Sequence, residues 1–399
     1  MEQTQAPPQA QPQVLAGIRV LDFGSFITAP YAAMLLAEMG ADVIKIERPV
    51  TGDPFRAFGT GLYSSHFQSH NRNKRSLALD FSTPAGAAAL EVLVAGADAV
   101  LVNVRPGVEE KMGLGYERLK AINPRLVYCA ITGYGATGPY ANRPAYDGAG
   151  QAISGWLSMF HEGKDARVAG PAVSDALTGL YAAMGMLGAL VERNTTGVGR
   201  KVEVSMLEAT ISFATEPLGK LFANGVPVPH YSRAAASQSF IVTCADGQRI
   251  GLHLSSPDKF WHGMLAALSR EDIGQKYPDR PSRVKRYDEL SLDLAEAFAT
   301  QPRDHWLPLL AKNDVPFAPE RRLEELADDP QVQHLDVFYE MTHPRYGQVK
   351  AAHRPVRFDG DNHSNFRPPP DLGEHTEEVL REAGLDDADI KKLADERAI

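Results

Sequence analysis

The sequence predicts an α/β protein with a large domain built on a parallel sheet and a second, smaller α/β domain. Short apolar runs alternate with amphipathic segments from residue 17 onward, and this order of strand, crossover and strand is typical of a parallel sheet covered by helices on both faces. The chain has 399 residues, too many for one simple core, which favours two domains. Residues 224–233 contain two prolines and a glycine, and we interpret them as a linker.

The strands of the large domain are predicted from short runs of apolar and β-branched residues. They are expected at 18–23, 41–47, 75–80, 98–103, 126–133 and 201–206. Helices are expected at 32–39, from Pro84 onward, and from a start near Asp175. The helix that starts near Asp175 is apolar almost all round, so we expect it in a core or at a subunit interface.

The composition divides the chain into four parts. Residues 1–15 are rich in Gln and Pro and lack the apolar region of a signal peptide, so a disordered tail is expected. Residues 16–223 are assigned to the large domain, and residues 224–330 to the linker and the small domain. Residues 331–399 carry a late helix and are expected to return to the large domain.

Charge and cysteine content exclude several classes of protein. The net charge is −9, whereas proteins that bind nucleic acids or membrane surfaces carry basic patches, so neither partner is expected. The two cysteines, Cys129 and Cys244, lie far apart and match no disulfide or metal pattern, which favours a reducing, cytoplasmic location. No uninterrupted apolar run is long enough to cross a bilayer, and no metal site is expected.

Positive residues follow the ends of predicted strands. Arg48 comes directly after the second strand, and Arg105 and Lys111 follow the fourth. Ligands of open parallel sheets bind beyond the carboxyl ends of the strands, where a multiply phosphorylated ligand needs cations. Solvated loop charges are an equally good interpretation of these residues from composition alone.

Asp175 stands where a proline-bounded loop leads into the long apolar helix. An aspartate at such a position is most often an N-cap residue. The positive end of a helix also favours an ionised carboxylate, which is the form that can attack a thioester. Both interpretations stay open at this point.

A nicotinamide-dependent oxidoreductase is an alternative that the sequence disfavours. Glu47 ends the second strand, where a dinucleotide-binding fold places its ribose-binding acid. Gly133, Gly135 and Gly138 match a G-x-G-x-x-G pattern, but Pro139 follows at once, and no helix opens there to receive a pyrophosphate.

The chain resembles the class III CoA-transferases, the CaiB/BaiF family that includes the formyl-CoA and carnitine CoA-transferases, and the related α-methylacyl-CoA racemases. The segments that carry the resemblance include VLDFGSFITAPYAAMLLAEMGADVIKIERP, LVNVRPGVEEKMGLGYERL and VSDALTGLYAAMGMLGAL. The resemblance extends from about Gly17 to the C-terminus. It implies a Rossmann-like large domain, a small domain, and a homodimer of two chains threaded through each other as interlocked rings.

Site residues are implied by the same resemblance. The family's nucleophilic aspartate falls on Asp175. The family positions that hold coenzyme A fall on Ile27, Thr28, Arg48, Leu79, Asp80, Asn103, Val104, Arg105, Lys111, Tyr146 and Asp147. Coenzyme A is then a substrate, with no permanently bound cofactor expected.

The implied function is transfer of CoA from an acyl-CoA thioester to a carboxylic acid through an aspartyl anhydride and an aspartyl–CoA thioester. An α-methylacyl-CoA racemase is the alternative. Racemases of this group carry a His–Asp pair where this chain has Tyr146-Asp147, and a phenol is a poor general base at neutral pH, which favours the transferase.

The acid substrates are the least determined part of the function. Formyl-CoA transferases have a run of glycines in the small domain, where this chain reads SRAAASQSF, which disfavours formate and oxalate. Arg233, with Ser237 and Gln238 nearby, is predicted to meet a second carboxylate. A small dicarboxylate such as succinate is therefore the expected substrate.

Overall fold

The computed structural model describes residues 13–160, 167–168, 170–255, 258–361 and 366–399. The chain folds into two compact units. Unit 1 combines the N-terminal part up to residue 215 with residues 336–399, and unit 2 comprises residues 216–335. The sequence analysis placed these boundaries at 223/224 and 330/331, so unit 2 begins and ends at somewhat different residues than expected.

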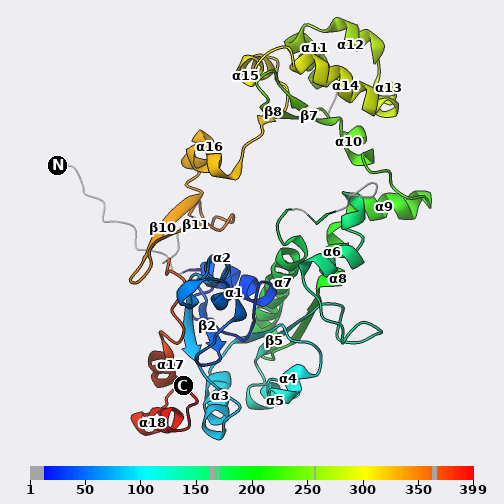
Figure 1. Ribbon diagram of the computed structural model, residues 1–399. Coiled ribbons are helices and arrows are strands. Elements are labelled where there is room, and N and C mark those ends of the chain that lie inside the picture. The colour runs from blue at the N-terminus through cyan, green and yellow to red at the C-terminus, as the bar shows by residue number, and fades with distance from the viewer. Residues whose placement is uncertain (1–12, 161–166, 169, 256–257, 362–365) are drawn as a thin grey trace, which may run out of the picture. The chain divides into compact units, whose positions relative to one another are not determined.

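Unit 1 is built on a parallel sheet whose described part has six strands in the order β3-β2-β1-β4-β5-β6 (Figure 1). The strands are β1 (Arg19–Asp22), β2 (Asp42–Glu47), β3 (Lys74–Ala78), β4 (Ala99–Val102), β5 (Val127–Thr132) and β6 (Lys201–Ser205). Every pairing within the sheet is parallel. The order reverses direction between β1 and β4, which creates a switch point at the carboxyl end of the sheet.

Helices cover both faces of the sheet, because alternate residues of each strand point to opposite faces. On one face Val20 and Val43 pack with α1 (Thr28–Glu38) and α7 (Val173–Thr196). On the other face Leu21 and Ile44 pack with four shorter helices. These are α3 (Pro84–Ala95), α5 (Tyr116–Ile122), α17 (Thr376–Glu382) and α18 (Asp387–Asp395).

The remaining elements of unit 1 lie in the connections. They are the 3₁₀ helices η1 (Pro54–Phe58), η2 (Thr60–Leu62) and η3 (Leu157–Met159), the helices α2 (Ser65–Asn71), α4 (Val108–Lys111), α6 (Asp147–Ile153) and α8 (Met206–Phe213), and the antiparallel hairpin β10 (Phe338–His343) and β11 (Gly347–Ala352). The unit boundary falls at the start of α9 (Thr215–Asn224), which lies in unit 2 from Glu216 onward.

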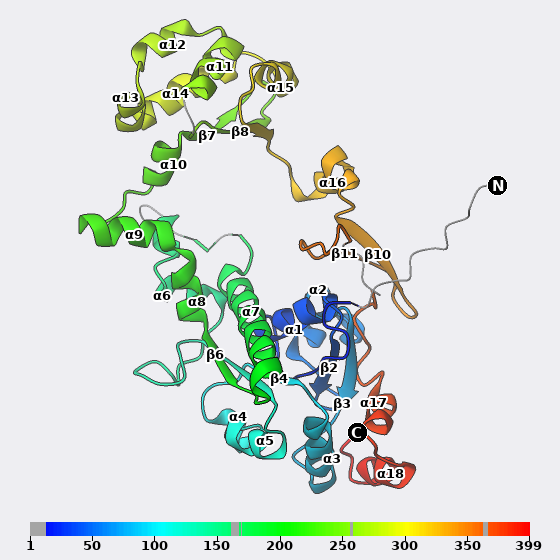
Figure 2. The same cartoon turned by 180° about the vertical axis from the view of Figure 1, so that it is seen from behind.

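The C-terminal segment closes the core of unit 1. Figure 2 shows α17 and α18, in red, beside β3 and α3. The Thr376 hydroxyl accepts a hydrogen bond from the amide of Ala78, and the carbonyl of Ala398 accepts one from the amide of Asp80. Val379 and Leu380 are fully buried against the sheet. Residues at the two ends of the sequence therefore share one hydrophobic core.

The described structure begins inside the N-terminal tail that the sequence analysis expected. The expected tail covers residues 1–15, and residues 1–12 lie outside the described residues. Leu15 is buried in the core beside α1, and its amide donates to the carbonyl of Met39.

Helix α7 is long and apolar, and this corrects the expectation that no segment could cross a bilayer by length and composition. Half of its most apolar stretch is buried inside the fold, as in the core helices of many water-soluble proteins. The other side of α7 exposes Leu180, Met184 and Val191.

Unit 2 has its own core. Its elements are α10 (Ser232–Ser237), β7 (Ser239–Thr243), β8 (Arg249–His253), α11 (Lys259–Leu268), α12 (Glu271–Lys276), α13 (Arg280–Lys285), α14 (Tyr287–Phe298), α15 (Arg303–Lys312), β9 (Phe317–Pro319), η4 (Leu323–Asp328) and α16 (Pro330–His334). The strands form an antiparallel sheet in the order β7-β8-β9. Trp261, Leu290 and Phe298 are among the buried residues that pack around it.

Candidate active site

A pocket of about 350 Å³ opens at the carboxyl end of the sheet, where the chain leaves β1, β4 and β5. It lies at the switch point between β1 and β4, the usual position for a ligand in an open parallel sheet. Its walls are formed by residues 26–28, 103–106, 131–133 and 143–146, with Val108, Ala141, Asp175 and Met206. All of them belong to unit 1.

Asp175 supplies the one carboxylate among the described residues that line this pocket. It is the third residue of α7, which begins at Val173 with Ala172 as its N-cap residue. The interpretation of Asp175 as the N-cap is therefore wrong. Its side chain is available for another role, although only 8% of the residue is exposed.

Asp147, the first residue of α6, caps the N-terminus of α7 although it does not belong to that helix. Its Oδ1 atom accepts hydrogen bonds from the backbone amides of Ser174 at 2.9 Å and of Asp175 at 3.4 Å. The other carboxylate oxygen accepts from the Gln151 side chain at 2.6 Å. The sequence could not reveal this contact, because Asp147 and Ser174 are 27 residues apart. Asp147 thus fixes the first turn of the helix that carries Asp175.

Burial and the neighbouring Asp147 carboxylate raise the pKa of Asp175 to about 7. Both effects oppose a negative charge on Asp175, since burial removes water and Asp147 brings a like charge close. Together they outweigh the stabilisation of the ionised Asp175 side chain that was expected from the positive end of the helix. Near neutral pH, Asp175 is poised between its protonated and ionised forms, which is common among groups that take part in catalysis.

The loop between β1 and α1 forms one wall of the pocket. Asn103, which follows β4, clamps this loop with its side-chain amide. Its Oδ1 atom accepts from the amide of Ser25 at 2.9 Å, while its Nδ2 donates to the Ser25 carbonyl and to the Thr28 hydroxyl. Gly179 lets this region approach α7, because a Cβ atom there would lie 2.8 Å from the Thr28 carbonyl oxygen.

Two arginines lie at the pocket without a counter-ion. Arg105 and Arg143 are both exposed and both line it. Within the described part of the chain, neither guanidinium has a carboxylate oxygen within 4.0 Å. The Arg143 guanidinium stacks over the Tyr140 ring at 3.9 Å. Unpaired cations beside a single carboxylate suit an anionic ligand.

The glycine-rich segment after β5 serves packing at the pocket. A Cβ atom on Gly133 would lie 2.3 Å from the Cβ atom of Ala145, so glycine is needed for this close approach. Tyr146 stands at the pocket with its ring against Phe26, at 5.7 Å between ring centroids. Among the residues described, no group of three or more His, Cys, Asp or Glu side chains could hold a metal ion.

Comparison with known proteins settles the family. Residues 15–376 match CoA-transferase family III. The chain belongs to this family. The transferase is 32% identical to the human succinyl-CoA:glutarate CoA-transferase, over 95% of this chain and 88% of the human protein. It is also 32% identical to the succinate–glutarate CoA-transferase of Agrobacterium fabrum, over 92% of this chain and 95% of that protein.

A solved structure confirms the α/β fold of the transferase. A CaiB/BaiF family protein from Brucella suis superposes with a TM-score of 0.82 at 30% identity, over 94% of this chain and 100% of that structure. The family and the named relatives also confirm the predicted function as CoA transfer from an acyl-CoA to a carboxylic acid.

The positions predicted to hold CoA all follow the carboxyl ends of strands, but the structure brings only some of them together. Those that line the pocket are Ile27, Thr28, Asn103, Val104, Arg105 and Tyr146. Arg48 and Lys111 are exposed cations outside its lining. Leu79 is fully buried in the core. Asp80 follows β3, where hydrogen bonds from Ser82, and to a lesser degree the charge of Arg48, hold its pKa below the usual value.

Arg143 is the charged residue of the pocket lining that the sequence analysis missed. It lies in the irregular loop between β5 and α6, where a lone arginine is most often a solvated surface charge. Its position three residues before Tyr146 of the Tyr146-Asp147 pair was the one available signal.

Proposed function

We propose that the transferase moves CoA between small dicarboxylic acids through covalent intermediates on Asp175. The observation that carries this proposal is a lone buried carboxylate in a pocket that also presents unpaired arginines. The printed substrates of the relatives, succinate and glutarate, support the choice of acids.

Asp175 acts as the nucleophile. One carboxylate oxygen attacks the thioester carbonyl carbon, the carbon–sulfur bond breaks, and CoA leaves as a thiolate, which gives a mixed anhydride. The thiolate then attacks the aspartyl carbonyl carbon and releases the donor acid, which leaves an aspartyl–CoA thioester. The acceptor carboxylate repeats both steps in reverse. One thioester is exchanged for another, so no bound cofactor is required.

The pocket favours each attack by position and by charge. The CoA thiolate stays bound through its nucleotide part, which makes its return effectively intramolecular. Ile27 and Thr28 line the pocket, and the backbone amide of neither has a hydrogen-bond acceptor among the described residues. These free N–H groups at the start of α1 stabilise the developing oxyanion.

The acceptor acid is recognised by cations at the pocket. Arg233, the residue first proposed for this role, lies in unit 2 and forms an ion pair with Glu216 at 3.3 Å. Arg143 is the better candidate, because it is unpaired and lines the pocket itself.

The test of this proposal is a panel of acceptors with succinyl-CoA as donor. Glutarate should give glutaryl-CoA, while formate and oxalate should give little product. Arg143→Ala should raise KM for glutarate by about 10-fold, as expected when a charge-assisted hydrogen bond is lost. Transfer to monocarboxylates alone, with dicarboxylates inert, would overturn the assignment of the acids.

Arg48 and Lys111 bind the phosphate groups of CoA in this proposal, because both are exposed cations beyond the ends of strands. Replacement of either by Ala is expected to raise KM for acyl-CoA at nearly constant kcat, at a cost of about 1–3 kcal/mol for a direct contact. Arg118→Ala is the matched control. Arg118 is also an exposed arginine, but it lies in α5 and pairs with Glu91 of α3, so it is not expected to bind a phosphate group. Unchanged KM values in both Arg48→Ala and Lys111→Ala would exclude these two residues from CoA binding.

A homodimer completes the proposal. Leu180, Met184 and Val191 expose more than half of their surfaces on α7, and a partner subunit that covers them explains this apolar face. Sedimentation or size-exclusion chromatography with light scattering should give twice the mass of 43.4 kDa. A monomer at micromolar concentration would contradict the interlocked arrangement.

A further inference from the structure

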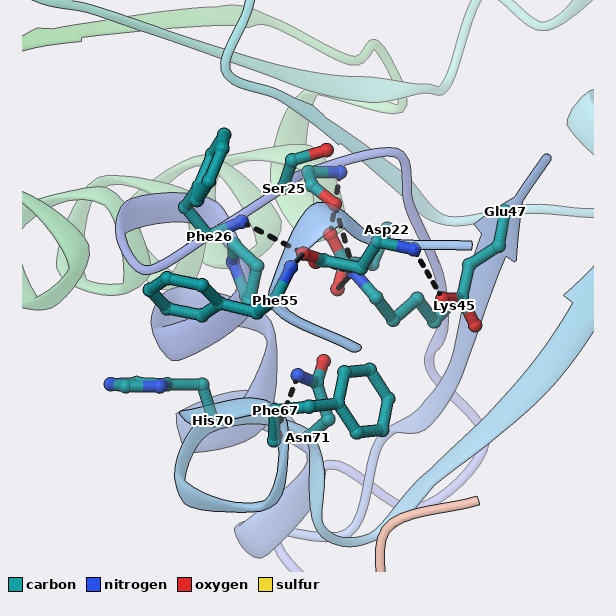
Figure 3. Close-up of polar contacts among 12 residues, drawn as sticks. Asp22, Ser25, Phe26, Lys45, Glu47, Phe55, Phe67, His70 and Asn71 are labelled. Atoms are coloured by element: carbon teal, nitrogen blue, oxygen red, sulfur yellow. Dashed lines mark hydrogen bonds and ion pairs between the residues drawn. The ribbon is translucent and has the colours of Figure 1, made fainter. Parts of the chain in front are cut away.

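Three acidic and three basic side chains are buried together beneath the wall of the pocket. Figure 3 labels three of them, Asp22, Lys45 and Glu47. This buried ionic network consists of Asp22, Lys45, Glu47, Asp53, Arg56 and Lys74. Each of them is less than 5% exposed, and their formal charges cancel. They come from β1, β2, β3, η1 and its N-cap residue, so the network joins three neighbouring strands on one side of the switch point.

Stability alone does not account for such a network. Removing charges from water costs several kcal/mol for each ion, and well-packed apolar residues often stabilise a core as well or better. What buried ion pairs provide in some proteins is a fixed geometry, because each partner must stay in one place to keep its contacts. The atoms that the network holds indicate which geometry is fixed here.

Lys45 holds the backbone of the loop between β1 and α1. Its ammonium group donates to the carbonyl of Gly24 at 2.8 Å and pairs with Asp53 at 3.0 Å. Burial opposes the charge, but Asp53, Asp22 and Glu47 together raise the pKa of Lys45, so it remains a cation. On the other side of the same peptide segment, Asp22 accepts from the amide of Gly24 at 2.8 Å.

Asp53 holds the next part of this loop. Its Oδ1 atom accepts from the amide of Phe26 at 3.3 Å and from the amide of Phe55 at 2.9 Å. Phe26 has φ of 64°, a left-handed conformation that costs a bulky residue about 1–3 kcal/mol and persists only where surrounding contacts enforce it. The Phe26 ring packs edge-on against Phe55 at 5.2 Å and against Tyr146.

The network also fixes the loop after β2. Glu47 accepts from Arg56 at 2.7 and 2.8 Å and from the amide of Asp53 at 2.9 Å. Arg48 follows Glu47 directly, and its carbonyl accepts from the amide of Gly52. The loop after β1, which lines the pocket, and the loop after β2 are thus both hydrogen-bonded to one set of buried charges.

We propose that Lys45 and Asp53 are positioning residues, which hold Phe26 in its left-handed conformation and so place the pocket wall formed by residues 26–28 for acyl-CoA binding. This inference rests on the proposed function, because it takes the pocket as the acyl-CoA site. Neither side chain touches the pocket, and both act through the backbone of the loop.

The test is a double-mutant cycle on the full-length enzyme. Lys45→Met/Asp53→Asn removes one charge of each sign, so the network stays neutral and the protein is expected to fold. This variant should raise KM for succinyl-CoA by about 10-fold or more. In Phe26→Gly the backbone at position 26 can adopt the left-handed conformation without strain. The ring contacts are lost, however, so this variant should also bind succinyl-CoA more weakly. The third variant combines all three substitutions. If the charges act through Phe26, its increase in KM should be at least about threefold smaller than the product of the two separate increases.

Glu38→Gln is the matched control for a buried ion pair. Glu38 ends α1, at the far end from the loop, and pairs with Arg72 while only 1% exposed. Glu38→Gln should lower the unfolding temperature but leave KM for succinyl-CoA within about twofold of the wild-type value. When it is combined with Phe26→Gly, the increase in KM should equal the product of the two separate changes. Multiplicative losses for Lys45→Met/Asp53→Asn and Phe26→Gly would overturn the positioning role. Absence of CoA transfer by the wild-type enzyme would instead overturn the proposed function, so the two failures are distinguishable.

Discussion

Asp175→Asn is expected to abolish CoA transfer and, at the same time, to raise the free energy of unfolding above pH 7. An amide cannot form the anhydride, so no covalent route remains. The gain in stability follows from the raised pKa of Asp175, about 7 in the folded protein against 3.8 as the ordinary value. Between these two pH values only the unfolded chain ionises at this residue, so the wild type loses stability as pH rises through this window.

The upper limit of this gain is about 4 kcal/mol, from about 3 pKa units at 1.36 kcal/mol each, and we expect about 1–3 kcal/mol. Urea unfolding at pH 5 and pH 8 checks the sign, since the advantage of the variant should grow with pH. Hydroxylamine treatment of wild-type enzyme with succinyl-CoA should modify the peptide that contains Asp175. Near-normal transfer by a folded Asp175→Asn protein, with deamidation excluded by mass spectrometry, would end the proposed mechanism.

The pH dependence of catalysis provides a second large effect. In the proposed mechanism only the ionised form of Asp175 attacks, so kcat/KM for succinyl-CoA should rise with pH and level off above the Asp175 pKa of about 7. At pH 5.5 about 3% of the carboxyl is ionised, against about 90% at pH 8, which corresponds to about a 30-fold difference in rate. A flat profile between pH 5.5 and pH 8 would exclude Asp175 as a group of raised pKa.

Asp147→Asn separates the electrostatic role of Asp147 from its structural role. The amide oxygen can still accept the hydrogen bond from the Ser174 backbone, but the negative charge beside Asp175 is gone. The midpoint of the pH profile should therefore move to lower pH, while the protein stays folded. An unmoved midpoint would assign the raised pKa of Asp175 to burial alone.

The sheet and its helices could be predicted because local patterns determine them. Each strand of the parallel sheet was expected within a few residues of its position, since buried parallel strands are short apolar runs such as β4. The hairpin of β10 and β11 was not predicted. The alternation of strand and helix also implied that Arg48 and Arg105 follow strands at the same edge. Which of these residues share a pocket depends on loop conformations that no periodicity encodes.

The surroundings of Asp175 could not be predicted for the same reason. The start of α7 lies two residues before Asp175, so local sequence alone suggested an N-cap that the fold assigns elsewhere. The cap comes from Asp147, and the raised pKa comes from burial that only the packed structure defines. The polar side chains of β2 and β3 likewise gave no sign that Lys45 and Lys74 are fully buried.

The return of the C-terminal segment to unit 1 has a consequence for synthesis on the ribosome. Val379 and Leu380 complete the core that Leu21 and Ile44 begin, and the carbonyl of Ala398 binds the backbone beside β3. One face of the nascent sheet is therefore only partly covered, by α3 and α5, until residues 376–398 have left the exit tunnel. Unit 2 is continuous in sequence and can fold during this interval. Termination of synthesis before α17 would leave part of this apolar face exposed, which makes the chain a substrate for chaperones and proteases.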